Sequence, residues 1–263
     1  MKVRDITAAV EEFAPLSIQE EWDNSGLCIG SPEDEVHGVL VGFDCTEALI
    51  DEAVALGCDM VITHHPLIFR GIRRICGEDP VGAAVMKAVK AGVAVYAAHT
   101  SADKVIAGVS GAMARRLGLE EIEVLEPEDG PFGLGAVGLF PEPMDGETAL
   151  QLVRDRFGVS VIRHSRTLRT PIRKVAMCGG SGAGEIGAAL KAGAQLYITA
   201  DVSYHNFFTP EGFMLMDIGH FESEVEIVEI FFSVLRKKFP TFAVRLSGCL
   251  DRSNPVHYFG LSE

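Results

Sequence analysis

The chain has 263 residues, 48% hydrophobic and 23% charged, a composition typical of a globular protein with a sizeable core. Its net charge of −14 argues against a general nucleic-acid coat or an anionic membrane surface as partner, because like charges repel. No apolar run approaches the ~20 residues of a membrane span, and the amino terminus lacks the apolar stretch of a signal peptide. Six cysteines without CxxC spacing favour buried, reduced thiols, so we expect a cytoplasmic protein.

The first third of the chain alternates helix and strand. Apolar side chains at helical spacing predict a helix over residues 3–13, and a turn-rich stretch with the only tryptophan, Trp22, follows it. A strand over 38–43, a helix from Thr46 to about residue 56 and a strand over 59–63 complete the pattern. Strand, helix and strand within ~30 residues indicate a βαβ crossover with parallel, buried strands.

A second unit of the same kind follows. It has a helix over 80–91, a strand over 93–98 and a helix over about 109–117. The acidic run over 120–129 is typical of a solvated connection between lobes. We therefore predict a first lobe over residues 1–130 and a second over 131–263, the two sharing one metal site.

The pattern then repeats along the chain. Residues 38–63 align without a gap on residues 174–199, so strand, helix, glycine and strand recur at an offset of 136. Further on, the residues His99 and Asp103 match His220 and Glu224 at an offset of 121. We predict an α/β fold of two similar lobes from an internal duplication, each with a mainly parallel sheet flanked by helices.

Polar residues follow four of the predicted strands. They are His64 and His65, the stretch from His99 to Asp103, the stretch from Asp201 to His205, and the stretch from His220 to Glu224. The carboxyl ends of parallel strands are where α/β proteins place their ligands. A histidine and a carboxylate at i and i+4 of a helix share one face, and this donor pair suits Zn, Mn, Fe or Co. More than four such ligands suggest two ions rather than one tetrahedral ion.

Several short motifs carry a resemblance to a known family. They are Thr63-His64-His65-Pro66, His99 to Asp103, Tyr204-His205 and Gly219 to Glu224, with Trp22-Asp23-Asn24 early and Asn254-Pro255 late. In combination they resemble the NIF-three-like family of dinuclear-metal-centre proteins, catalogued as GTP cyclohydrolase 1 type 2 homologues. Only about forty residues, roughly 131–170, fill the place where longer members insert an extra domain, so the resemblance implies the compact form.

The resemblance implies a site as well as a fold. The implied ligands of two divalent ions are His64, His65, Asp103, His220 and Glu224, with Glu224 bridging the ions. The resemblance places His99 beside these ligands, and we expect it to orient Asp103 or a bound water. We also consider His99 and His205 as proton shuttles. The family further implies a ring-shaped homohexamer. For Asp201 and His205 we prefer a hydrogen-bonded corner between strand and helix to direct ligation.

Two function classes stay open at this point. The first is a metal-dependent hydrolase resembling the GTP cyclohydrolase 1 type 2 homologues, with water activated between the ions and a small anionic or nucleotide substrate. The second is a non-enzymatic, metal-dependent scaffold or regulator that acts through protein partners. The glycine-rich stretch over 179–184 has the context of a phosphate cradle, but a tight turn for close packing is the preferred interpretation. Arg70, Arg73 and Arg74 could neutralise an anionic substrate or simply lie on a solvated loop.

Overall fold

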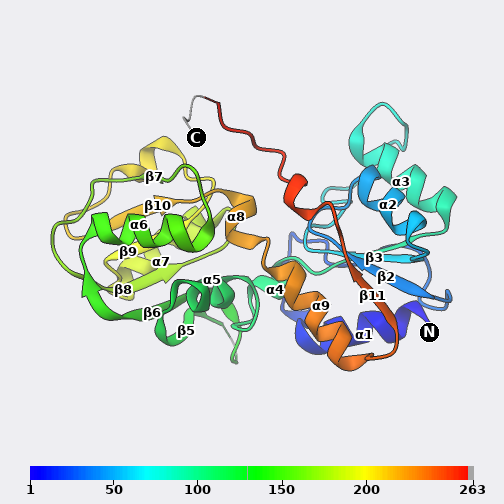
Figure 1. Cartoon of the computed structure of the whole chain (residues 1–263), viewed down its shortest axis with the longest axis horizontal. Helices are drawn as coiled ribbons and strands as arrows, with labels where there is room; N and C mark the ends of the chain where they lie inside the picture. The colour runs from blue at the N-terminus through cyan, green and yellow to red at the C-terminus, as the bar shows by residue number, and fades with distance from the viewer. Residues whose placement is uncertain (129, 260–263) are drawn as a thin grey trace. The chain divides into compact units, whose positions relative to one another are not determined.

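The computed structural model describes residues 1–128 and 130–259, and the chain forms two compact units (Figure 1). Unit 1 consists of Met1–Ala102 and Ile227–His257, and unit 2 of Asp103–Glu226 and the residues from Tyr258. The units differ from the predicted lobes, which met at residue 130. The late segment belongs to unit 1 because strand β11 (Ala243–Leu246) pairs with β2 (Gly38–Val41), and helix α9 (Ile227–Lys238) packs against α1 (Val3–Phe13).

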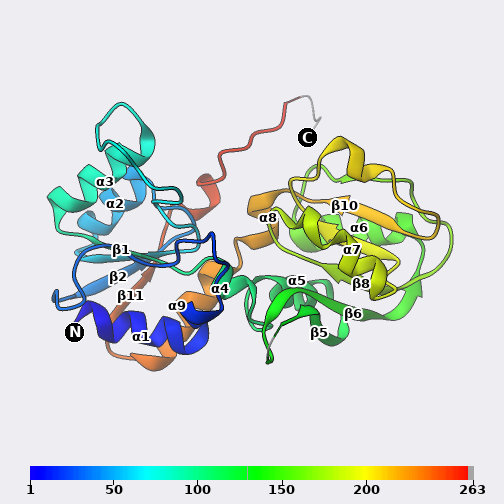
Figure 2. The same cartoon turned by 180° about the vertical axis from the view of Figure 1, so that it is seen from behind.

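Unit 1 is a five-stranded sheet between two layers of helices. The strand order is β1 (Gly26–Ile29), β4 (Ala94–Ala97), β3 (Met60–Thr63), β2 and β11. All neighbours are parallel except β1 and β4, so this sheet is mainly parallel as predicted. Helices α2 (Glu47–Ala55) and α3 (Pro80–Ala91) cover one face, and α1 (Val3–Phe13) and α9 (Ile227–Lys238) cover the other (Figures 1 and 2).

Local sequence explains the boundaries of these helices. The side chain of Thr46 caps α2 by accepting a hydrogen bond from the backbone N–H of Leu49 at 3.2 Å. Asp79 caps α3 in the same way, Pro80 occupies the first turn, and Gly92 ends the helix in the left-handed conformation. The apolar faces that result pack on the sheet and bury Leu40, Val61 and Val95 from its strands.

Unit 2 has a six-stranded mixed sheet. Its strand order is β5 (Glu120–Pro127), β6 (Gly133–Met144), β8 (Ile172–Met177), β9 (Leu196–Thr199), β10 (Met214–Asp217) and β7 (Arg163–His164). Its longer helices are α5 (Val109–Leu117), α6 (Gly146–Phe157) and α7 (Ile186–Lys191). Only β8, β9 and β10 are parallel to one another, because β5, β6 and β7 pair antiparallel with their neighbours. The prediction of a mainly parallel second sheet therefore holds for its centre alone.

The acidic run that was predicted to be a connection is strand β5 of unit 2. It pairs with β6 and buries Leu125, while its glutamates lie on the exposed side of this sheet edge. The charges indicated solvent exposure correctly. Charged side chains are exposed on the edge strand of a sheet as well as in a loop, so the charges alone did not distinguish the two.

The internal duplication predicted from the sequence is present in the structure. Strands β2 and β3 pair in parallel with Val39 opposite Met60, and β8 and β9 pair in parallel with Val175 opposite Leu196, at the same offset of 136. In both units the next strand is parallel and the edge strand beyond it antiparallel. The α/β class, with two sheets flanked by helices, is thus confirmed.

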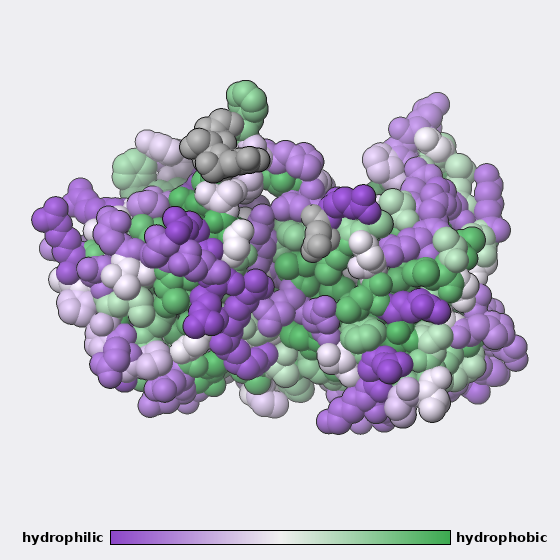
Figure 3. Space-filling view, viewed as in Figure 1, coloured by the Kyte–Doolittle hydropathy of each residue, from purple (hydrophilic) through white to green (hydrophobic). Residues whose placement is uncertain are grey.

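Short helical turns occupy several connections. They are η1 (Leu16–Ile18), α4 (Thr100–Asp103), η2 (Gly182–Glu185), η3 (Tyr204–Phe207), α8 (His220–Glu224) and η4 (Leu250–Arg252). Among them, α4, η3 and α8 carry candidate site residues. Hydrophilic and hydrophobic residues are interspersed over the surface of each unit on the face in Figure 3. Among the described residues, none of the helices combines the length and the apolar character that crossing a membrane requires.

Candidate metal centre

Three histidines meet at one edge of the sheet in unit 1. His64 and His65 follow strand β3, and His99 follows the neighbouring parallel strand β4, so the chain delivers all three to the same edge. One ring nitrogen from each histidine lies within 4.8 Å of the others. Three imidazoles at this separation could hold a metal ion.

Each of these histidines has its Nδ1 atom fixed by an oxygen. The Nδ1 of His64 lies 3.0 Å from the carbonyl oxygen of Ala98. The Nδ1 of His65 lies 2.8 Å from Oδ1 of Asp44, and the Nδ1 of His99 lies 2.8 Å from Oδ1 of Asp23. An oxygen at this position selects the tautomer with hydrogen on Nδ1 and makes Nε2 the coordinating nitrogen.

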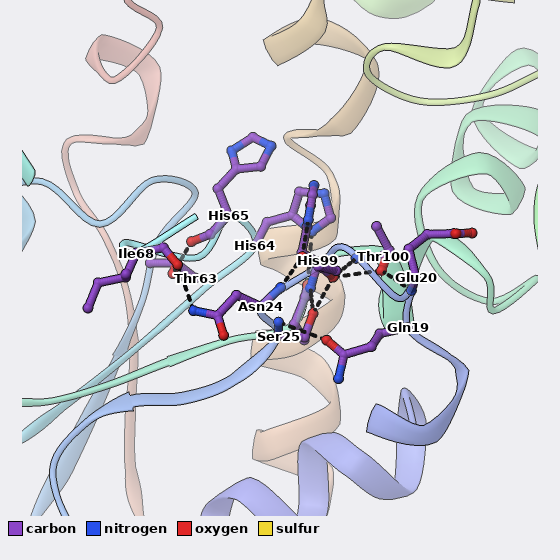
Figure 4. A network of polar contacts seen from close by, with 12 residues as sticks. Gln19, Glu20, Asn24, Ser25, Thr63, His64, His65, Ile68, His99 and Thr100 are labelled. Atoms are coloured by element: carbon purple, nitrogen blue, oxygen red, sulfur yellow. Dashed lines mark hydrogen bonds and ion pairs between the residues drawn. The ribbon is translucent and has the colours of Figure 1, made fainter. Parts of the chain in front are cut away.

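Asp23 is the most strongly held of these partners, and Figure 4 shows the network around His99, Ser25 and Thr100. Its carboxylate, which has no exposed surface, accepts hydrogen bonds from the ring of His99, the backbone N–H and hydroxyl of Thr100, and the hydroxyl of Ser25. Burial alone would raise the pKa of Asp23, but hydrogen bonds from His99, Thr100 and Ser25 outweigh burial and hold the pKa well below its usual range. The ring of His99 is therefore held by an ionised carboxylate.

Unit 2 contains a second histidine and carboxylate set. In helix α8, Nε2 of His220 lies 3.0 Å from Oε2 of Glu224, whose side chain is only 4% exposed. The Nδ1 of His220 lies 2.7 Å from Oδ2 of Asp201, which repeats the arrangement seen at His65 and His99. Asp201 adopts a left-handed backbone conformation with φ of 52°. Such a conformation is uncommon outside glycine. Together with the contact to His220, it matches the hydrogen-bonded corner predicted for Asp201.

Glycines of the 179–184 stretch make room for Glu224. A Cβ atom on Gly180 would lie 2.0 Å from Oε1 of Glu224, and one on Gly179 would lie 3.2 Å from its Cγ. The backbone N–H of Gly180 also donates to the hydroxyl of Ser223 at 2.9 Å. The preferred interpretation of this stretch, a tight turn that permits close packing, is confirmed.

Asp103 lies in the same region of unit 2 as Glu224. Burial raises the pKa of the Cys178 thiol, and the negative charges of Asp103, Glu185 and Glu224 raise it further. One carboxylate oxygen of Asp103 lies within 4.8 Å of one of Glu224, so the two carboxylates repel each other. A divalent cation would relieve that repulsion.

His205 lies apart from these residue sets. It is in turn η3, where its ring contacts those of Tyr204 and Phe208 at centroid distances of 5.4 and 6.4 Å. It belongs to none of the groups of described residues whose atoms could hold an ion together. Its role as a proton shuttle stays a prediction.

The donor sets of both units fit a divalent ion. They offer imidazole nitrogens and carboxylate oxygens and no thiolate, which is the ligand chemistry of Zn, Mn, Fe or Co. In unit 1 the oxygens behind His65 and His99 are themselves carboxylates, as is common behind metal-bound histidines. The residues present therefore match the group that the sequence suggested.

Two of these carboxylates had no role in the sequence-based prediction. Asp44 follows strand β2 by three residues and Asp23 belongs to the Trp22-Asp23-Asn24 motif, but neither lies next to a histidine in the sequence. Only the fold brings them to His65 and His99. The available signals were the position of Asp44 just after a parallel strand and the place of Asp23 in a motif that carried the family resemblance.

The fold and the site together define a class of protein, one with two α/β units and a histidine and carboxylate set suited to divalent ions. The chain belongs to the Duf34/NIF3 (NGG1p interacting factor 3) family, whose sequence profile matches residues 1–255. It is 34% identical over 228 residues to the GTP cyclohydrolase 1 type 2 homolog of Clostridium perfringens, covering 85% of this chain and 87% of that protein. The homolog of the same name from Lactococcus lactis is 33% identical over 264 residues, covering 98% and 99% of the two chains.

A solved structure shares the fold over the same length. The crystal structure of Staphylococcus aureus hypothetical protein SA1388 superposes with a TM-score of 0.90 at 25% identity, covering 98% of this chain and 99% of that one. The resemblance inferred from the short motifs is therefore confirmed.

Proposed function

We propose that this protein is a metal-dependent hydrolase that holds two divalent ions with residues of both units. The proposed ligands are His64, His65, Asp103, His220 and Glu224, and His99 is a further candidate. The observation that carries the proposal is the contact between Nδ1 and an oxygen atom that four histidines make. His64, His65, His99 and His220 each have Nδ1 within 3.0 Å of an oxygen, which directs Nε2 toward a ligand.

The path of the chain supports a single site built from the two sets. The chain passes from unit 1 to unit 2 between Ala102 and Asp103, and it returns between Glu226 and Ile227. Both crossings lie within four residues of a proposed ligand. Helix α4 spans the first crossing and carries Asp103 as its last residue.

When bound, two divalent ions would supply Lewis acidity, which activates water and polarises the bond to be cleaved. The protein's own residues would fix the positions of these ions and move protons. Glu224 can bridge because a carboxylate has two oxygens, whereas a histidine ring coordinates through one nitrogen. The Nδ1 of His99 is held by Asp23, so its Nε2 can either coordinate or exchange a proton, but not both at once. If His99 coordinates, His205 is the remaining candidate for the proton shuttle.

The substrate, assembly and compartment are further parts of the proposal. Relatives that carry the name GTP cyclohydrolase 1 type 2 homolog make a purine nucleotide the first substrate to test. A homohexamer follows from the family resemblance, and light scattering should then give six times the chain mass of 28.3 kDa. The six cysteines are all unpaired, which supports a reducing compartment such as the cytoplasm.

The test compares metal content and turnover in matched variants. Wild type, Glu224→Gln and Glu229→Gln would be loaded with Zn²⁺ or Mn²⁺, dialysed, analysed for metal and assayed with GTP and with phosphoesters. Glu229 is the control because it is an exposed glutamate on α9. We expect two ions per chain and turnover in wild type and Glu229→Gln, and both reduced in Glu224→Gln. Two ions still bound by Glu224→Gln would contradict the bridging role. Bound metal without turnover of any substrate would favour the scaffold function instead.

A further inference from the structure

We propose that Trp22 and Phe69 form a platform that binds a planar heteroaromatic ring of the substrate by stacking. The proposal rests on the metal-dependent function above, because the platform adjoins the histidine cluster of unit 1. It adds the residues that would bind the heteroaromatic ring of an anionic substrate, which the proposed function leaves unassigned.

The two aromatic side chains are exposed although both are large and apolar. Trp22 is 59% exposed and Phe69 is 44% exposed. Their ring centroids lie 5.8 Å apart with the planes inclined by 59°, so the two rings contact each other and form an angled surface, a wedge, rather than a parallel stack. A flat ring can lie on the face of one and against the edge of the other.

The ring of His99 connects this wedge to the proposed metal site. Its centroid lies 6.1 Å from that of Trp22 and 5.9 Å from that of Phe69. His99 in turn belongs to the cluster of His64 and His65. A ring stacked on the platform would therefore place its substituents beside the residues proposed to hold the ions.

Polar contacts hold both aromatic residues in place. The side-chain amide of Asn24 donates to the carbonyl oxygen of Ile68 at 2.6 Å, which ties the turn of Trp22 to the segment of Phe69 (Figure 4). On the other side of Trp22, the backbone N–H of Asp23 donates to Glu20, whose own backbone N–H donates to the hydroxyl of Thr100. These contacts fix the backbone beside both rings, which reduces the entropy that the segments lose when a ligand binds.

The charge of the neighbouring loop indicates the rest of the ligand. Arg70, Arg73 and Arg74 follow Phe69 within five residues, and all three are exposed. A chain with a net charge of −14 that gathers three arginines next to an exposed aromatic pair offers a local site for an anion. The wedge and the arginines together complement a heteroaromatic ring with a phosphate or carboxylate group.

The chain allows a direct test because Trp22 is its only tryptophan. Adenosine 5′-monophosphate carries both a ring and a phosphate, and ribose 5-phosphate carries the phosphate alone. Affinities for both probes would be measured by calorimetry on metal-loaded protein whose metal content is known. Trp22 fluorescence would be followed in parallel. We expect wild type to bind adenosine 5′-monophosphate about tenfold or more tightly than ribose 5-phosphate, with quenching of the fluorescence.

The variants Trp22→Leu and Phe69→Leu keep an apolar side chain but remove the aromatic face. In each variant, the ratio of the affinity for adenosine 5′-monophosphate to that for ribose 5-phosphate should fall toward one, while the affinity for ribose 5-phosphate stays unchanged. Phe259→Leu is the control, because Phe259 is a fully exposed phenylalanine outside the platform, and it should retain the preference.

Three results would overturn the proposal. They are equal affinity of wild type for the two probes, an unchanged preference in the two platform variants, or shielding of Trp22 from acrylamide in the assembled protein. The last would identify the platform as a surface between copies of the chain. A ring preference in a protein that binds no divalent metal at all would leave the platform standing, and that lack of metal binding would contradict the metal-dependent function.

Discussion

Replacing Gly180 by alanine tests whether the position of Glu224 matters for metal binding. The added Cβ atom would lie 2.0 Å from Oε1 of Glu224 and 2.9 Å from its Cδ, both too close for the atoms to stay where they are. Because the obstructing atoms belong to the end of a side chain, the carboxylate can move away at little cost to the fold. The backbone cost is also modest, since a φ of 58° costs a residue with a Cβ ~1–2 kcal/mol. We therefore expect Gly180→Ala to fold, with metal affinity reduced by at least tenfold.

Gly193→Ala provides the matched control. Gly193 has a φ of 73°, and a Cβ there would meet no atom within 4 Å. In metal-free protein, both variants should lose ~1–2 kcal/mol of the free energy of unfolding in urea, because both have the same backbone cost. Only Gly180→Ala should lose metal when ions per chain are measured after dialysis. Wild-type metal content in Gly180→Ala, or an equal loss in Gly193→Ala, would refute the reasoning.

Three further predictions concern the surroundings of the site and the core. Asp44→Asn replaces the carboxyl group that contacts Nδ1 of His65 and should weaken metal binding ~10–100-fold in a competition titration, whereas Asp51→Asn, at an exposed ion pair, should not. Chelation should lower the thermal midpoint, since an ion present at 100 times its Kd stabilises the fold by ~2.7 kcal/mol; an unchanged midpoint would argue against a tightly bound ion. Burial, followed by the negative charges of Cys28 and Asp44, raises the pKa of the Cys45 thiol to about 12. Because the folded-state pKa is raised above the ordinary value of 9.0, the thiol's contribution to folding stability is present below pH 9 and is lost as the pH rises from 9 to 12. Alkylation of Cys45 in the native protein at pH 8 should accordingly be slow, and rapid alkylation would contradict the burial.

The sequence predicted well what depends on local pattern. Hydrophobic periodicity and glycine positions sufficed for the β2–α2–β3 unit and its repeat, down to the register of Val39 and Val175. These features are local because a strand, a helix and the turn between them are specified by neighbouring residues. The histidines at the strand ends were found for the same reason.

What the sequence did not reveal depends on contacts between distant segments. The return of α9 and β11 to unit 1 requires knowing that β11 adds to the edge at β2, more than 200 residues earlier in the chain. Asp23 reaches His99 across 76 residues in the same way. Amphipathic patterns show that an element is half-buried, but they do not say against which partner.

The left-handed backbone conformation of Asp201 has an energetic cost that points to a role in the proposed metal site. Asp201 and Glu121 are the non-glycine residues with positive φ among those described, at 52° and 51°. A glycine at either position would remove strain in the folded chain but add freedom to the unfolded chain, so the free energy of unfolding should change by no more than ~1 kcal/mol. Only Asp201 contacts a proposed ligand, through its hydrogen bond with His220. Asp201→Gly should therefore weaken metal binding while Glu121→Gly leaves it unchanged, and Asp201→Asn, which keeps a hydrogen-bond acceptor, should fall between them. Equal metal affinities in Asp201→Gly and Glu121→Gly would show that Asp201 only shapes the turn between strand and helix. His220 would then bind an ion without a hydrogen-bond partner at Nδ1.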